Sequence, residues 1–429
     1  RPPSQPEQTM SDAIELPRFF TVRPRLVSRG IASVATEVVQ RLSPHRDRFS
    51  RDASVAVAVG SRGISSIVEV TAATVEWLQS IGTRPFVVPA MGSHGGATPE
   101  GQTQVLASLG VTPETVGCEI RATMETVCIG ESQTGIAIHS DKIASQADHV
   151  ILINRIKPHT RLVGDIQSGL CKMLMIGLGN HHGASRFHQA FKQFDYRLDH
   201  VAPDFVSKLI ASLPITLGVA IVEDAFDQPG RIEVLPSEEF LTREPKILEV
   251  AQQWMPGLPF RQAEFLIVDE MGKEISGTGI DTNVVGRKAC DRQAQEEEWP
   301  KIDEIYVRSL TDKTAGNASG IGVTEYTHQR VVNAIDFAKT RINSVTAGHV
   351  SGAAVPASFE SDLAVFQAVR SQSATPADEV RWMRIRNTLD LAEIGCSEGY
   401  WEEAQRREDL ECLNEPVPMQ FTATGDLAT

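Results

Sequence analysis

The sequence predicts an α/β protein made of two α/β domains with mainly parallel sheets. In the first half, the buried apolar run Ser54–Gly60 passes through a glycine turn into the helical pattern Ile67–Ile81. Strand, glycine turn and helix then recur, an order typical of parallel sheets covered by helices. After the proline-rich segment Pro256–Pro259, the pattern restarts with the strand Ala263–Val268, which indicates a second domain.

Four segments follow from this pattern. A chain of 429 residues exceeds one ordinary domain. Residues 1–20 begin with a polar, proline-rich stretch and are expected to form a flexible arm. Residues 21–257 are expected to form an N-terminal α/β domain that carries the site, and residues 258–413 a C-terminal α/β domain that closes it. Residues 414–429 are polar and are expected to be a loose tail.

The second half contains three further predicted elements. A strand is expected at Ile305–Leu310, and helices are expected at Tyr326–Lys339 and Asp378–Leu391.

Composition excludes several classes of protein. With 41% hydrophobic and 22% charged residues, the chain is globular, and its formal charge of −14 argues against binding nucleic acid or anionic membranes. The six cysteines are widely spaced, and no two form a CxxC pair. This pattern is typical of free thiols in a reducing cytosol. No apolar run approaches the ~20 residues of a membrane span. We therefore expect a cytoplasmic protein, and the sequence leaves open whether it forms a homo-oligomer.

Polar side chains follow three of the predicted strands. Arg62 comes after the first strand, His94 after Arg84–Met91, and His159 after Val150–Ile153. In open α/β sheets, ligands bind at the loops beyond the carboxyl ends of the strands. The sequence therefore predicts a functional site at this edge of the first sheet.

The residue types leave several roles open. Arg62 stands either in a plain turn or in a turn that holds a phosphate or carboxylate through two hydrogen bonds. His94 lies between glycines and has little side-chain packing beside it, so a catalytic or ligand-binding role competes with a structural one. The same choice applies to His159, which follows Pro158.

A single lysine, Lys172, lies among apolar residues such as Leu170 and Met173. It either extends from an apolar helix face into solvent or serves as a functional amine with a depressed pKa or a covalent attachment. The helical run that follows contains His181, His182 and His188, which suggests a metal site.

These residues together resemble the nickel-pincer nucleotide family typified by lactate racemase. Gly92-Ser93-His94 is similar to the family's Gly-x-His turn after its second strand. Pro158-His159 followed by a glycine-rich segment and Lys172 is similar to its second motif. His188, sixteen residues after Lys172, stands where the family has its nickel-binding histidine. Glu270 and Lys273, three apart after a strand, match a pair in the family's second domain.

The chain also departs from the family's pattern. Of the usual Asp-x-x-Arg-Pro turn only Arg62 is present, because Val59 stands in the Asp position and Gly63 in the Pro position. Glu270 stands where the family has glutamine. These differences place the chain in a divergent branch.

The resemblance implies a specific cofactor. This is the nickel-pincer nucleotide (nickel pyridinium-3,5-bisthiocarboxylic acid mononucleotide), attached covalently to Lys172 and built by dedicated cofactor-synthesis enzymes. His188 would be the nickel ligand, with His181 and His182 as alternatives.

The resemblance also implies roles for the other residues. His94 and His159 would be the acid/base pair. Arg62 or Lys273 would bind the substrate carboxylate or the cofactor phosphate, and Glu270 would lie at the cofactor.

The implied activity is that of an isomerase, a racemase or epimerase that inverts carbon 2 of a 2-hydroxy acid by reversible hydride transfer in a cleft between the domains. The divergence and the polar loops favour an aldonate such as gluconate over lactate. Two alternatives stay open: a zinc-dependent hydrolase that uses His181, His188 and His94, and a non-catalytic protein that binds sugar acids or nucleotides.

Overall fold

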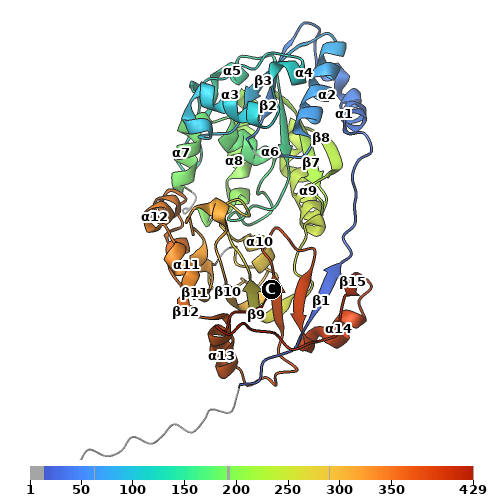
Figure 1. Ribbon diagram of the computed structural model, residues 1–429. Helices are drawn as coiled ribbons and strands as arrows, with labels where there is room; N and C mark the ends of the chain where they lie inside the picture. The colour runs from blue at the N-terminus through green and yellow to red at the C-terminus, as the bar shows by residue number, and fades with distance from the viewer. Residues whose placement is uncertain (1–13, 62, 191–193, 289, 429) are drawn as a thin grey trace, which may run out of the picture. The chain divides into compact units, whose positions relative to one another are not determined.

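The computed structural model describes residues 14–61, 63–190, 194–288 and 290–428 (Figure 1). The chain forms two compact units. One unit is Val27–Met255, and the other joins Pro256–Thr429 to the N-terminal segment that ends at Leu26. Each contains a largely parallel sheet with helices, so the predicted α/β class is confirmed.

The sheet of the first unit has the strand order β3-β2-β6-β7-β8. Neighbours from β3 to β7 run parallel, and β8 is antiparallel to β7. The run Ser-Val-Ala-Val-Ala-Val of β2 is apolar throughout, because both faces of a parallel sheet are covered. The strands are β2 (Ser54–Val59), β3 (Arg84–Pro89), β6 (His149–Arg155), β7 (Ile215–Glu223) and β8 (Pro229–Pro236).

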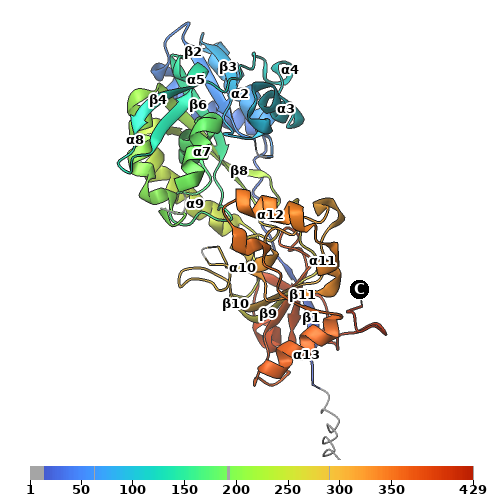
Figure 2. The same cartoon turned by 90° about the vertical axis from the view of Figure 1, so that its left-hand side faces the viewer.

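Two layers of helices cover this sheet, on opposite sides of it in Figure 2. Because side chains alternate along a strand, Val55 and Val57 pack with α1 to α4 on one face, whereas Ala56 and Ala58 pack with α6 to α9 on the other. The elements are α1 (Val34–Leu42), α2 (Ile67–Ser80), α3 (Pro99–Ser108), α4 (Pro113–Val116), β4 (Thr126–Glu131), β5 (Ala137–Asp141), α5 (Lys142–Ser145), α6 (Leu170–Lys172), α7 (Asn180–Ala190), α8 (Ala202–Ser212) and α9 (Phe240–Trp254).

The sheet of the second unit has the order β12-β11-β10-β9-β13-β14-β1-β15. The five strands from β12 to β13 are parallel, and β14, β1 and β15 continue the sheet in antiparallel fashion. The elements are β1 (Phe19–Pro24), β9 (Gln262–Val268), α10 (Thr282–Val285), β10 (Lys301–Val307), β11 (Tyr326–His328), α11 (Gln329–Ala334), α12 (Phe337–Thr346), β12 (Ala357–Phe359), α13 (Asp362–Gln372), β13 (Trp382–Ile385), β14 (Ile394–Ser397), α14 (Trp401–Gln405) and β15 (Leu410–Cys412).

The structure corrects the predicted start of the chain. Residues 1–13 of the expected arm lie outside the described residues, but β1 is a strand of the second sheet, drawn blue beside the red strands in Figure 1. Phe20 and Val22 are buried there, and Val22 pairs with Ile394 and Cys412. Residues 21–24 therefore belong with the C-terminal unit, because their hydrogen-bonding partners lie near the other end of the chain.

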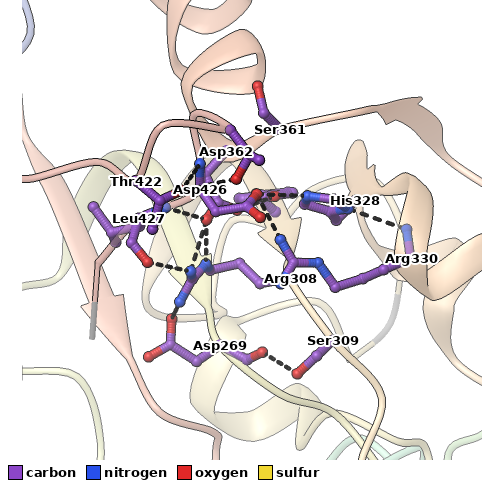
Figure 3. A network of polar contacts seen from close by, with 12 residues as sticks. Asp269, Arg308, Ser309, His328, Arg330, Ser361, Asp362, Thr422, Asp426 and Leu427 are labelled. Atoms are coloured by element: carbon purple, nitrogen blue, oxygen red, sulfur yellow. Dashed lines mark hydrogen bonds and ion pairs between the residues drawn. The ribbon is translucent and has the colours of Figure 1, made fainter.

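The expected loose tail is also wrong. The backbone of Val417 bonds with Phe19, and Leu427 is buried. The Leu427 N–H donates to Asp362 Oδ2 at 2.7 Å, in the network that Figure 3 shows. The polar composition of the tail misled the prediction, because its few apolar side chains cover one face of the second sheet.

Two expected helices differ as well. The stretch predicted as the helix Tyr326–Lys339 begins with the strand β11 before α11 and α12. The stretch Asp378–Leu391 contains β13, whose Trp382 is fully buried beside Phe265 of β9. The strand residues of both segments pair with parallel neighbours in the sheet, so tertiary contacts override the local preference for a helix.

Removing the carboxylate of Asp362 should destabilise the second unit. Burial disfavours its charged form, but hydrogen bonds from Arg308 and Tyr306 hold the pKa of its carboxyl below the ordinary value. Asp362→Ala leaves buried Arg308 with one carboxylate fewer, which costs about 3–5 kcal/mol of unfolding free energy. Urea titration followed by circular dichroism measures this loss.

The matched control for this prediction is Glu402→Ala, whose partner Arg406 is exposed. That surface pair contributes about 0–1 kcal/mol. Equal losses of stability in the two variants would contradict the stabilising role of the buried network.

Candidate functional site

Three loops at the carboxyl edge of the first sheet carry polar residues. Ser61 follows β2, and the two predicted histidines, His94 and His159, follow β3 and β6. Ser61 Oγ forms a short hydrogen bond with His94 Nδ1, which joins the first two loops. Arg62, also predicted here, lies outside the described residues.

The His94 loop is anchored through its backbone. The Gly92 N–H donates to the carbonyl of Gly177 at 3.0 Å, and Gln102 Nε2 donates to the Gly92 carbonyl at 2.9 Å. Gly92 has a φ of +62°, and a Cβ there would lie 3.1 Å from the Cβ of Ala184 in α7, so glycine is required for this approach. The loop therefore bears directly on the segment that follows Lys172, while His94 itself is exposed.

Lys172 ends the single turn of α6, which continues as a π-helical turn over Met173–Gly177. Lys172 is half-buried between the buried side chains of Cys171 and Met173. Asn154, near the end of β6, donates from Nδ2 to the Gly169 carbonyl at 2.7 Å. This contact ties the start of the Lys172 helix to the same sheet edge, and π-turns of this kind often occur at functional sites.

His159 organises its own loop. Its Nδ1 accepts the N–H groups of Arg161 at 3.0 Å and of Leu162 at 3.1 Å. A ring nitrogen that accepts hydrogen bonds carries no proton, so the proton of the neutral ring is on Nε2. The His159 N–H donates in turn to Gln167 Oε1 at 2.9 Å. The half-buried imidazole is therefore held as a hydrogen-bond donor at Nε2.

The structure places two of the three predicted metal-binding histidines in the first turn of α7. His181 and His182 are exposed, and the His182 ring packs against His139 of β5 with 4.3 Å between centroids. Burial, and then the nearby His182 and Arg186, lower the pKa of His139. The backbone of His188 belongs to α7, but its side chain lies outside the described residues.

Among the described side chains, the one grouping of three metal-ligating residues is His328, Asp362 and Asp426 in the second unit. Arginines already compensate its charge, as Figure 3 shows: Arg308 binds Asp362 at 2.6 Å, and Arg330 binds Asp426 at 2.6 Å. This cluster is an ion-pair network that joins the C-terminal segment to the sheet.

Glu270 and Lys273 follow β9 in the second unit. Glu270 Oε1 accepts hydrogen bonds from Arg386 at 3.1 Å and from Asn387 at 2.8 Å. Lys273 Nζ donates to the Gly277 carbonyl and, at 2.9 Å, to Asn343 Oδ1. These contacts hold both side chains against loops of their own unit.

A polar cleft of about 630 Å³ lies in the second unit beside Phe260 and Trp299. Two of its arginines are compensated: Arg381 pairs with Glu403, and Arg407 pairs with Asp409 outside the lining. The cleft contains none of the predicted site residues.

Several polar residues of the site were not singled out from the sequence. Ser61 is next to Arg62, so the glycine turn could have indicated it. Glu223, at the end of β7, pairs with Arg155 and accepts the Ser65 N–H at 2.7 Å. It supports the β2 loop, and no local pattern marks it.

Residues 46–197 match the model of the lactate racemase N-terminal domain. This span therefore forms a domain of the lactate racemase N-terminal type. The matched span includes His94, His159 and Lys172, and the second unit lies outside it. No curated protein matches the chain.

Two solved structures have a fold similar to that of this chain. The first, a Thermotoga maritima protein, has 13% identity and a TM-score of 0.51, covering 76% of this chain and 84% of that one. The second is the lactate racemase apoprotein from Thermoanaerobacterium thermosaccharolyticum. It has 15% identity and a TM-score of 0.50, covering 73% of this chain and 76% of that one. Within the described residues, no helix is long and apolar enough to cross a membrane.

The loop geometry predicts the tautomer of His159. In protein with ¹⁵N-labelled histidine, we expect NMR to show Nδ1 without a proton and Nε2 with one, because Nδ1 accepts two backbone N–H groups. His159→Gln assigns the signal. A proton on Nδ1 of His159 would overturn this description of the loop.

Proposed function

We propose that this chain is a racemase or epimerase acting at carbon 2 of a 2-hydroxy acid, with a nickel-pincer nucleotide attached to Lys172. One observation carries the proposal. The loops of Ser61, His94 and His159 share a sheet edge that backbone contacts tie to the Lys172 helix. All of these residues lie in the span that matches the lactate racemase N-terminal domain.

The residues present fit the chemistry of such a cofactor. Lys172 is half-buried, and its sequence neighbours Cys171 and Met173 are buried. Burial favours an uncharged, amide-like attachment over an ammonium. Imidazoles, which suit nickel, stand on the next helix. We propose His188 as the ligand, with His181 and His182 as alternatives.

Lys172 would hold the cofactor, which would supply a reversible hydride acceptor for carbon 2 of the substrate. The histidines would accept and return the proton of the substrate hydroxyl group. If His94 donates its Nδ1–H to Ser61, the lone pair on its Nε2 would be the group that accepts that proton. The Nε2–H of His159 would donate a hydrogen bond to a substrate oxygen. For Nε2 to accept a proton instead, the ring proton would have to move to Nδ1, which would then release two backbone N–H groups.

Further proposals concern the substrate. Arg62 or Lys273 would bind its carboxylate or the cofactor phosphate, and Glu270 would contribute at the cofactor. A guanidinium suits either anion because it offers two parallel donors. The polar character of Ser61, Asn154 and His159 supports a polyhydroxylated acid such as an aldonate.

The first test is the attachment to Lys172. We expect protein co-produced with the cofactor-synthesis enzymes to carry stoichiometric nickel and a mass increment on the Lys172 peptide. Lys172→Ala should lose both, and Lys157→Ala should keep both. Zinc on an unmodified chain would favour the hydrolase, whereas ligand-induced stabilisation without metal or turnover would favour the binding protein.

The second test is turnover with a panel of 2-hydroxy acids from lactate to gluconate, measured by optical rotation or chiral chromatography. His94→Ala should lower kcat about 10²–10⁴-fold without loss of nickel, because it removes an acid/base group. Near-normal racemisation by His94→Ala would rule out this role. Preference for lactate over the aldonates would contradict the proposed substrate class.

A further inference from the structure

A carboxyl group that the proposed chemistry does not use lies beneath the Lys172 helix. Glu244 of α9 is 1% exposed, and its Oε2 accepts the Cys171 N–H at 2.9 Å. Its Oε1 has no hydrogen-bond partner in the part of the chain that the structure describes. Burying a carboxyl group with incomplete hydrogen bonding costs free energy.

The chain makes room for this carboxyl group. A Cβ on Gly169 would lie 2.4 Å from Glu244 Oε1, so a larger residue at that position would require the buried carboxyl group to move. Gly169 is the residue before α6, whose first N–H groups have no partners within the helix. Glu244 therefore lies beside the backbone N–H groups at the start of the segment that leads to Lys172.

Glu244 can change charge near neutral pH. Burial raises its pKa to about 7, while hydrogen bonds from Cys171 and Leu170 act in the opposite direction. The titratable group that faces it is the Cys171 thiol, whose pKa burial and Glu244 raise well above the ordinary value. Above neutrality the carboxylate accepts the N–H groups more strongly, because a charged acceptor makes the stronger bond.

We propose that Glu244 is a positioning residue for Lys172, holding the first turn of the helix from which that lysine extends. The carboxylate sets the orientation and exposure of the amine before any cofactor is attached. This inference rests on the proposed function, in which Lys172 is the attachment point.

The test is the reactivity of Lys172 in the full-length, cofactor-free protein. Trace labelling with acetic anhydride, read by peptide mass spectrometry, compares Lys172 with the exposed Lys246 across neutral pH. We expect the ratio of their labelling rates to change several-fold with a midpoint near the Glu244 pKa of about 7. Glu244→Gln should abolish that change, and Glu249→Gln, at an exposed site of α9, should keep it.

A second measurement follows the backbone. Hydrogen exchange of the peptide over residues 169–178 should be about tenfold faster or more in Glu244→Ala, because a hydrogen bond to a charged group is lost. If Glu244→Ala does not fold, the isosteric Glu244→Gln decides through its labelling profile. A Lys172 profile in Glu244→Gln equal to that of the wild type overturns the proposal.

These readouts need neither nickel nor turnover. Absence of a Lys172 adduct in co-produced protein would therefore count against the proposed function alone. A pH-independent Lys172 in protein that does carry the adduct would count against the positioning role alone.

Discussion

The parallel pairing of three strands is the constraint on which the candidate site depends. The last residue of β2, Val59, pairs with Pro89 of β3 and with Ile153 of β6, so the three strands reach the same edge of the sheet. Main-chain hydrogen bonds hold this register whatever residues follow the strands. The loops are therefore free to carry polar side chains, and Ser61 and His94 meet as a consequence.

A second set of backbone contacts places Lys172 relative to that edge. Gly92 donates to the carbonyl of the last residue of the π-turn, and Asn154 donates to the carbonyl before α6. Glu244 accepts an N–H of the first turn of α6. The segment is thus held at both ends by partners from distant elements. Such multiple support holds the backbone around Lys172 in one geometry, because each contact limits a different motion.

The second unit uses charge for a different purpose. Arg308 lies between Asp269 and Asp362, which also accepts the N–H of Leu427 near the end of the chain. The buried charges satisfy one another, so they hold the ends of the polypeptide against the sheet without requiring a metal. The charged groups of this network already have their counter-charges. This compensation distinguishes the structural network of the second unit from the candidate site of the first.

The sequence alone determined the strands β2 and β6, the loops after them and the segment around Lys172, because hydrophobic periodicity and glycine turns act over a few residues. It could not assign β1 to its sheet, recognise β13 as a strand, or place Glu244 under a helix that begins 74 residues earlier. Those features depend on contacts between segments far apart in the chain. Only the tertiary structure determines which segment pairs with a neighbouring strand and which carboxyl group is buried away from water.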